Sequence, residues 1–108
     1  MVQQEFAHKA AKILENDENV IGLAVAGSWI TNEIDEFSDI DLIIVTRQKI
    51  SHSKNMMIDY AKRLGNFLSG FTGEHVGEPR VLICLYDNPL LHVDIKFLTL
   101  EEFYTRVE

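Results

Sequence analysis

The sequence predicts an α/β (α+β) domain, a mixed β-sheet of about four strands with helices packed on one side. Three observations predict this class: an amphipathic helical stripe near the N-terminus, two short apolar runs rich in β-branched residues, and a hairpin pattern in the last third of the chain. The 108 residues suit one domain with one modest core. Hydrophobic residues make up 46% of the chain and charged residues 25%, which is an ordinary globular mixture.

The first half of the chain alternates between helical and strand patterns. Residues 2–16 predict a helix, because apolar residues recur there at three- and four-residue steps with polar residues between them. The apolar run from Val20 to Ala26 predicts a buried strand, and a short helix is expected over 28–33. A second apolar run, Ile40 to Thr46, predicts the second strand.

The second half predicts one longer helix and a hairpin. Apolar residues at helical spacing predict a helix over roughly 53–69, and a loop rich in turn-forming residues is expected over 71–79. A further apolar run, Val81 to Tyr86, and the alternating segment Leu91 to Leu98 are separated by an Asp-Asn-Pro turn. They are expected to pair as the third and fourth strands.

A capping box marks the start of the final helix. Thr99 is followed three residues later by Glu102, so a helix is expected from Leu100 onward, and the sequence stops inside it. We therefore expect residues 1–108 to form one domain, either a minimal one or the N-terminal part of a longer chain.

Composition argues against several classes of protein. The net charge of −7 disfavours a non-specific nucleic-acid binder. It does not exclude a nucleotide site, because metal ions can supply the positive charge. The single cysteine, Cys84, lies in an apolar run and is expected to be a buried thiol in a reducing compartment. No apolar stretch approaches the roughly 20 residues of a membrane span. No signal pattern opens the chain, and a cytoplasmic location is expected.

The segment from Val20 to Val45 contains the candidate site. Gly27 and Ser28 follow the first strand directly, where a glycine lets the backbone approach a ligand and a serine with unpaired amides suits a phosphate. Asp39 and Asp41 open the second strand and share one of its faces, because side chains alternate along a strand. Two crowded carboxylates repel each other, so either one is protonated or a cation lies between them.

The last predicted strand carries a second polar stripe. Leu91, Val93, Ile95 and Phe97 face one way on that strand, whereas His92, Asp94 and Lys96 face the other.

These motifs resemble a known signature. Gly27-Ser28, ten residues, and then Asp39-x-Asp41 running into an apolar strand resemble the DNA polymerase beta-like nucleotidyltransferase superfamily. Asp94 resembles its third carboxylate, and the resemblance covers nearly the whole chain. Within the superfamily, Trp29 and the last strand are most similar to aminoglycoside adenylyltransferases of the streptomycin type, which carry a helical second domain.

The resemblance implies a magnesium-dependent enzyme. It would transfer a nucleoside monophosphate, AMP from ATP, to a hydroxyl of a small molecule such as an aminoglycoside, by a two-metal mechanism. Asp39 and Asp41 would bridge two Mg²⁺ ions, and Asp94 would hold the ion nearest the acceptor and accept its proton. Gly27 and Ser28 would bind the β- and γ-phosphates.

One departure from the family pattern concerns positive charge. Relatives commonly carry a basic residue and a glycine shortly after Gly-Ser, where this chain has Thr31 and Asn32. Lys96 shares a face with Asp94 and is the candidate replacement for binding the nucleotide.

Several alternatives stay open. The chain also resembles the minimal nucleotidyltransferases, and it would then be an antitoxin whose acidic face docks a basic toxin. A third possibility is a domain that binds nucleotide without turnover. At the level of single residues, Ser28 and Asp39 could be simple caps, and Asp94 could be an edge-strand charge paired with Lys96 or His92.

Overall fold

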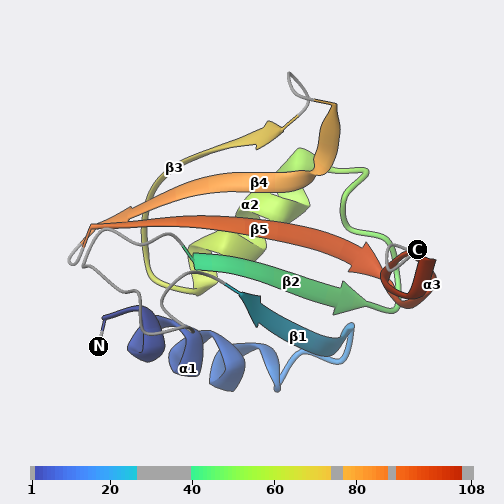
Figure 1. Ribbon diagram of the computed structural model, residues 1–108, viewed down its shortest axis with the longest axis horizontal. Coiled ribbons are helices and arrows are strands. Elements are labelled where there is room, and N and C mark those ends of the chain that lie inside the picture. Colours follow the sequence, from blue (N-terminus) through green and yellow to red (C-terminus); the bar gives the residue numbers. More distant parts are fainter. Residues whose placement is uncertain (1, 27–39, 74–76, 88–89, 106–108) are drawn as a thin grey trace.

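The computed structural model describes residues 2–26, 40–73, 77–87 and 90–105. The elements run in the order α1 (Val2–Leu14), β1 (Val20–Ala26), β2 (Ile40–Thr46), α2 (Lys54–Arg63), β3 (Asn66–Gly73), β4 (Glu78–Asp87), β5 (Leu91–Thr99) and α3 (Leu100–Thr105). The strands form one five-stranded sheet in the order β1-β2-β5-β4-β3 (Figure 1). β2 and β5 are parallel and the other neighbours antiparallel, so the predicted mixed sheet is confirmed.

The sheet has one strand more than predicted. The helix expected over 53–69 ends at Arg63, and β3 begins at Asn66 inside the expected helix. The apolar spacing in this stretch fits a helix, but pairing with β4 prevails over that local pattern. Phe67 lies opposite Tyr86 on β4, with ring centroids 5.9 Å apart. β4 is correspondingly longer than predicted and starts at Glu78.

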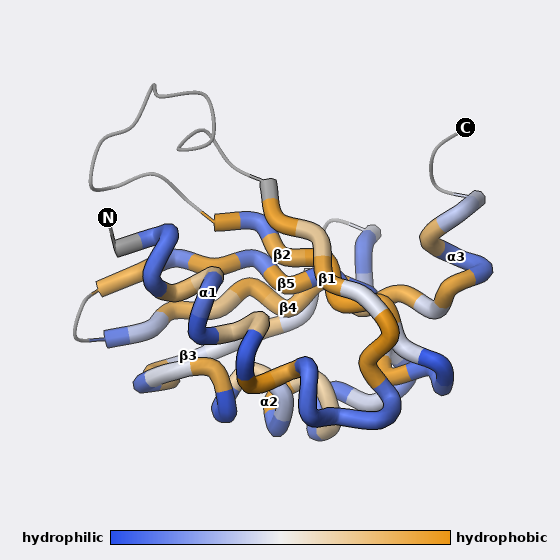
Figure 2. Tube along the Cα trace, turned by 90° about the horizontal axis from the view of Figure 1, so that it is seen from below, coloured by the Kyte–Doolittle hydropathy of each residue, from blue (hydrophilic) through white to orange (hydrophobic). Residues whose placement is uncertain are grey.

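One core lies on one face of the sheet. α1 runs beside β1 (Figure 1), and α2 lies below β4 and β5 in the view of Figure 2. The buried residues of this core from the helices and their loops are Phe6, Ala10, Leu14, Ile50, Met57, Tyr60, Ala61 and Leu64. Those from the strands are Ile40, Leu42, Ile44, Leu82, Cys84, Tyr86, Leu91, Val93, Ile95 and Phe97. Alternate residues of β2, β4 and β5 therefore face the helices, as the sequence pattern predicts for β5.

The prediction of a buried cysteine is confirmed within this frame. Cys84 is a buried free thiol, and burial raises its pKa to about 12, so the thiol is neutral. None of the helices in the described part of the chain is long and apolar enough to cross a bilayer.

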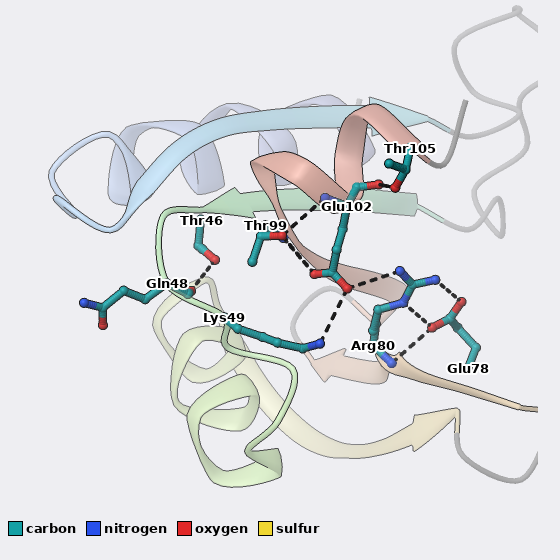
Figure 3. A network of polar contacts seen from close by, with 8 residues as sticks. All are labelled: Thr46, Gln48, Lys49, Glu78, Arg80, Thr99, Glu102 and Thr105. Atoms are coloured by element: carbon teal, nitrogen blue, oxygen red, sulfur yellow. Dashed lines mark hydrogen bonds and ion pairs between the residues drawn. The ribbon is translucent and has the colours of Figure 1, made fainter. Parts of the chain in front are cut away.

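The capping box forms as predicted and begins α3. Thr99 donates its N–H and its hydroxyl to Glu102 Oε1 at 3.0 and 3.2 Å, and the Glu102 N–H donates back to Thr99 Oγ1 at 3.3 Å (Figure 3). The other oxygen of Glu102 lies 3.4 Å from Arg80 Nη1 and 3.6 Å from Lys49 Nζ. These contacts attach α3 to β4 and to the segment after β2.

Arg80 also holds Glu78 at the start of β4. Arg80 Nε and Nη2 donate to the two carboxylate oxygens of Glu78 at 2.9 and 3.1 Å (Figure 3). Lys96 Nζ of β5 lies 3.4 Å from Glu78 Oε2. The hydrogen bonds from Arg80, helped by the charge of Lys96, lower the pKa of Glu78 to about 2.

We expect Tyr86→Phe to lower the free energy of unfolding by about 1 kcal/mol. The buried Tyr86 hydroxyl donates to Ala61 O at 2.6 Å and so ties β4 to α2. The loss stays modest, because Ala61 O keeps a second hydrogen bond from the Leu64 N–H. Urea denaturation measures the change. Tyr104→Phe, at a residue that is 67% exposed, is the control, and equal effects of the two variants would contradict the assignment.

We expect Glu78→Gln to destabilise the protein in a pH-dependent way. The folded-state pKa of Glu78 lies below its ordinary value of 4.5, so its stabilisation is present above that value and disappears as pH falls toward 2. The difference from the wild type should be about 1 kcal/mol or less at pH 7, since the ion pairs are partly exposed. Denaturation curves between pH 2 and pH 7 are compared with those of the exposed Glu101→Gln control. A difference that does not change with pH would contradict the argument.

Candidate functional site

The structure brings two of the three predicted carboxylates together. Asp41 on β2 and Asp94 on β5 are Cα partners on neighbouring parallel strands. Both lie on the face opposite the core, because the residues flanking each of them in sequence are buried among the core side chains. We call this side of the sheet the open face. Neighbouring strands are about 4.8 Å apart, so the two carboxyl groups project side by side.

The end of β1 lies next to this pair. Ala26, the last described residue before Gly27, is the Cα partner of Asp41. Residues Gly27, Ser28 and Asp39 lie outside the described residues, as does the short helix expected over 28–33. The chain therefore leaves β1 beside Asp41, where the predicted phosphate-binding corner begins.

His92 and Lys96 flank Asp94 on the same face of β5. His92 Nε2 lies 3.3 Å from Asp94 Oδ1, which agrees with the alternative prediction that Asp94 pairs with His92. Lys96 is instead paired with Glu78, at 3.4 Å. Sequence reasoning missed Glu78 and Arg80, because both precede the strand start predicted at Val81. The Glu-x-Arg spacing, which places both side chains on one face of an extended segment, was the available signal.

The two described carboxylates suit a hard divalent cation. Carboxylate oxygens are preferred ligands of Mg²⁺, which keeps several waters and needs only one or two protein carboxylates. Among the described residues, no group of three or more histidine, cysteine, aspartate or glutamate side chains is placed to hold a metal. The chemistry of Asp41 and Asp94 therefore fits the predicted ion, with Asp39 as the further ligand that the sequence predicts.

A separate hollow lies at the other end of β2. It has a volume of about 700 Å³ and begins just beyond the strand, at Arg47 and Gln48. Its other lining residues are Glu18, Asn19, Ile50, Met56 and Tyr60. Neither Asp41 nor Asp94 lines it, so it is not the space in front of the carboxylate pair.

Comparison with known proteins supports the superfamily that the motif predicts. A search among curated proteins found no significant match. The family model described as "Polymerase beta, Nucleotidyltransferase" matches residues 8–74, which include β1, β2 and α2. This range covers more than half of the chain and contains Asp41 together with the Gly27-Ser28 motif. The chain belongs to the polymerase beta nucleotidyltransferase family.

Proposed function

We propose that this chain transfers AMP from ATP to a hydroxyl group of a small molecule. Nucleotidyl transfer in general follows from the family. The single observation that carries the finer proposal is the register of Asp41 and Asp94, which aligns two carboxylates on the open face. The acceptor class that the sequence resemblance implies is an aminoglycoside.

The proposed reaction forms one bond and breaks another at the α-phosphorus. The acceptor oxygen bonds to that phosphorus, the bond to the bridging oxygen of pyrophosphate breaks, and the hydroxyl proton passes to a base. Asp94 is the proposed base, and the His92 ring 3.3 Å from its Oδ1 orients the carboxylate. Two Mg²⁺ ions, when bound by Asp39, Asp41 and Asp94, would stabilise the charge on the attacking and leaving oxygens.

Positive charge for the phosphates is proposed to come from β5. Lys96 lies two residues beyond Asp94 on the same face, and its side chain is 28% exposed. Gly27 and Ser28 are proposed to bind the β- and γ-phosphates from the other side of the carboxylate pair. This division of roles would compensate for the missing basic residue after Gly-Ser.

We expect Mg²⁺ and ATP together to raise the melting temperature, and Asp41→Asn and Asp94→Asn each to weaken ATP binding at least tenfold. Ligand at a hundredfold excess over its Kd stabilises a folded protein by about 2.7 kcal/mol, which a thermal scan resolves. Each variant removes one of two adjacent negative charges, so its melting temperature without ligand should not fall.

Asp59→Asn on the exposed side of α2 is the matched control, and it should keep the full ATP-dependent shift. Chelation of Mg²⁺ should abolish the shift in the wild type. Unchanged melting of the wild type at saturating Mg²⁺ and ATP would contradict the proposal. So would an undiminished shift in both aspartate variants.

A further inference from the structure

An apolar strip lies beside Asp94 on the open face. The Cα partner of Asp94 on β4 is Ile83, and the partner of Ile83 on β3 is Phe71. One cross-strand row therefore runs from Asp41 through Asp94 and Ile83 to Phe71. Val81 and Leu85 lie on either side of Ile83 on the same face of β4. We call Phe71, Val81, Ile83 and Leu85 the apolar shelf.

The shelf is accessible. Phe71 is 50% exposed and Leu85 is 37% exposed, whereas Val81 and Ile83 are half-buried. The charged side chains that border it on β5 and β4, Lys96 and Glu78, are paired with each other. A ligand on the shelf thus meets apolar surface next to the ion-paired group formed by Lys96, Glu78 and Arg80.

A β-bulge turns Phe71 toward this face. Phe67 pairs with Tyr86 on the core side, but the next partners are Ser69 and Leu85, so the register shifts by one residue at Leu68. Without the shift, Phe67 and Phe71 would face the same side, because they are four residues apart on one strand. Bulges commonly re-aim side chains next to functional sites. The shift places a phenyl ring on the side of the sheet that carries Asp94.

We infer that the apolar shelf binds the body of the acceptor while its hydroxyl reaches Asp94. This rests on the proposed function and narrows the acceptor to a molecule with an apolar ring, aromatic or alicyclic, beside the reacting hydroxyl. Two strand spacings separate Asp94 from Phe71, about 10 Å, which is the span of one or two fused rings plus a linking group. A fully hydrophilic, polycationic aminoglycoside fits this surface less well.

The extent of the shelf favours a small molecule over a protein. A stable protein interface buries about 800 Å² on each partner and involves roughly 20–30 residues a side. The shelf consists of four side chains. Small-molecule sites combine apolar walls with a few placed polar groups, and here Asp94 and Asp41 continue the same row.

The test compares two acceptors that share their sugar hydroxyls. 2-Naphthyl β-D-glucoside and methyl β-D-glucoside differ only in the apolar group, and their affinities are measured by NMR titration of the protein without nucleotide. The wild type should bind the naphthyl compound at least tenfold more tightly. Phe71→Ser should reduce this preference to within about twofold, because the exposed half of the phenyl side chain, which is the part available to the ligand, is lost.

Leu68→Ser is the matched control. Leu68 is as exposed as Phe71, at 53%, and lies on the same strand, but it occupies the bulge and has no partner in the cross-strand rows. It should keep the full naphthyl preference. With ATP and Mg²⁺ present, Phe71→Ser should raise KM for the naphthyl acceptor and leave KM for ATP unchanged.

Three results would overturn the inference: no naphthyl preference in the wild type, equal losses in Phe71→Ser and Leu68→Ser, or a wild-type dimer in sedimentation that Phe71→Ser dissociates. The last result would make the shelf a contact between copies of the chain. Because the binding arm uses no nucleotide, it is independent of ATP binding. A protein that prefers the naphthyl compound but does not bind ATP would refute the proposed transfer reaction and retain the shelf as a binding site.

Discussion

The parallel pairing of β2 with β5 is the constraint on which the rest of the structure depends. It is the one parallel contact between described strands, and it lies inside the sheet rather than at an edge. Its register is fixed on the core side, where Leu42 pairs with Ile95 and Ile44 with Phe97, all buried. A slip of one residue would turn every side chain of the strand to the other face. The apolar core therefore determines that Asp94 stands beside Asp41.

In this arrangement one face of the sheet carries the buried core, and the other carries the two carboxylates. Like charges directly opposite each other on neighbouring strands are destabilising, by a fraction of a kcal/mol to about 1 kcal/mol. The buried residues on the opposite face offset that cost, as the bidentate Arg80–Glu78 pair and its contacts to Lys96 and Glu102 also do. A divalent cation bound by the pair would convert the repulsion into attraction.

Much of the fold could be predicted from the sequence, because its strands and its final helix carry local signals. β1 and β2 are short apolar runs rich in β-branched residues, and β5 alternates apolar and polar residues. Thr99 and Glu102 mark α3 through hydrogen bonds three residues apart. β3 could not be predicted in this way, since its apolar residues fit a helical step and its pairing with β4 is a tertiary effect. The candidate site, too, could be predicted only in part. Alternation along a strand predicts which face carries Asp41 or Asp94, but their shared row requires a register between distant segments.

β3, the strand that sequence reasoning missed, also carries Phe71, whose ring distinguishes the two sides of the site. β1 and β2 lie on one side of β5 in the sheet, and β4 and β3 lie on the other; the family match covers β1, β2 and β3. Asp94 stands on the strand between them, with Asp41 on the β2 side and Ile83, a member of the apolar shelf, on the β4 side. Side chains on the open face of β3 and β4 can therefore change without altering the core contacts that hold the two carboxylates in register. The same carboxylate pair could thus be combined with different neighbouring surfaces, and in this chain the bulge at Leu68 places the Phe71 ring on that neighbouring surface.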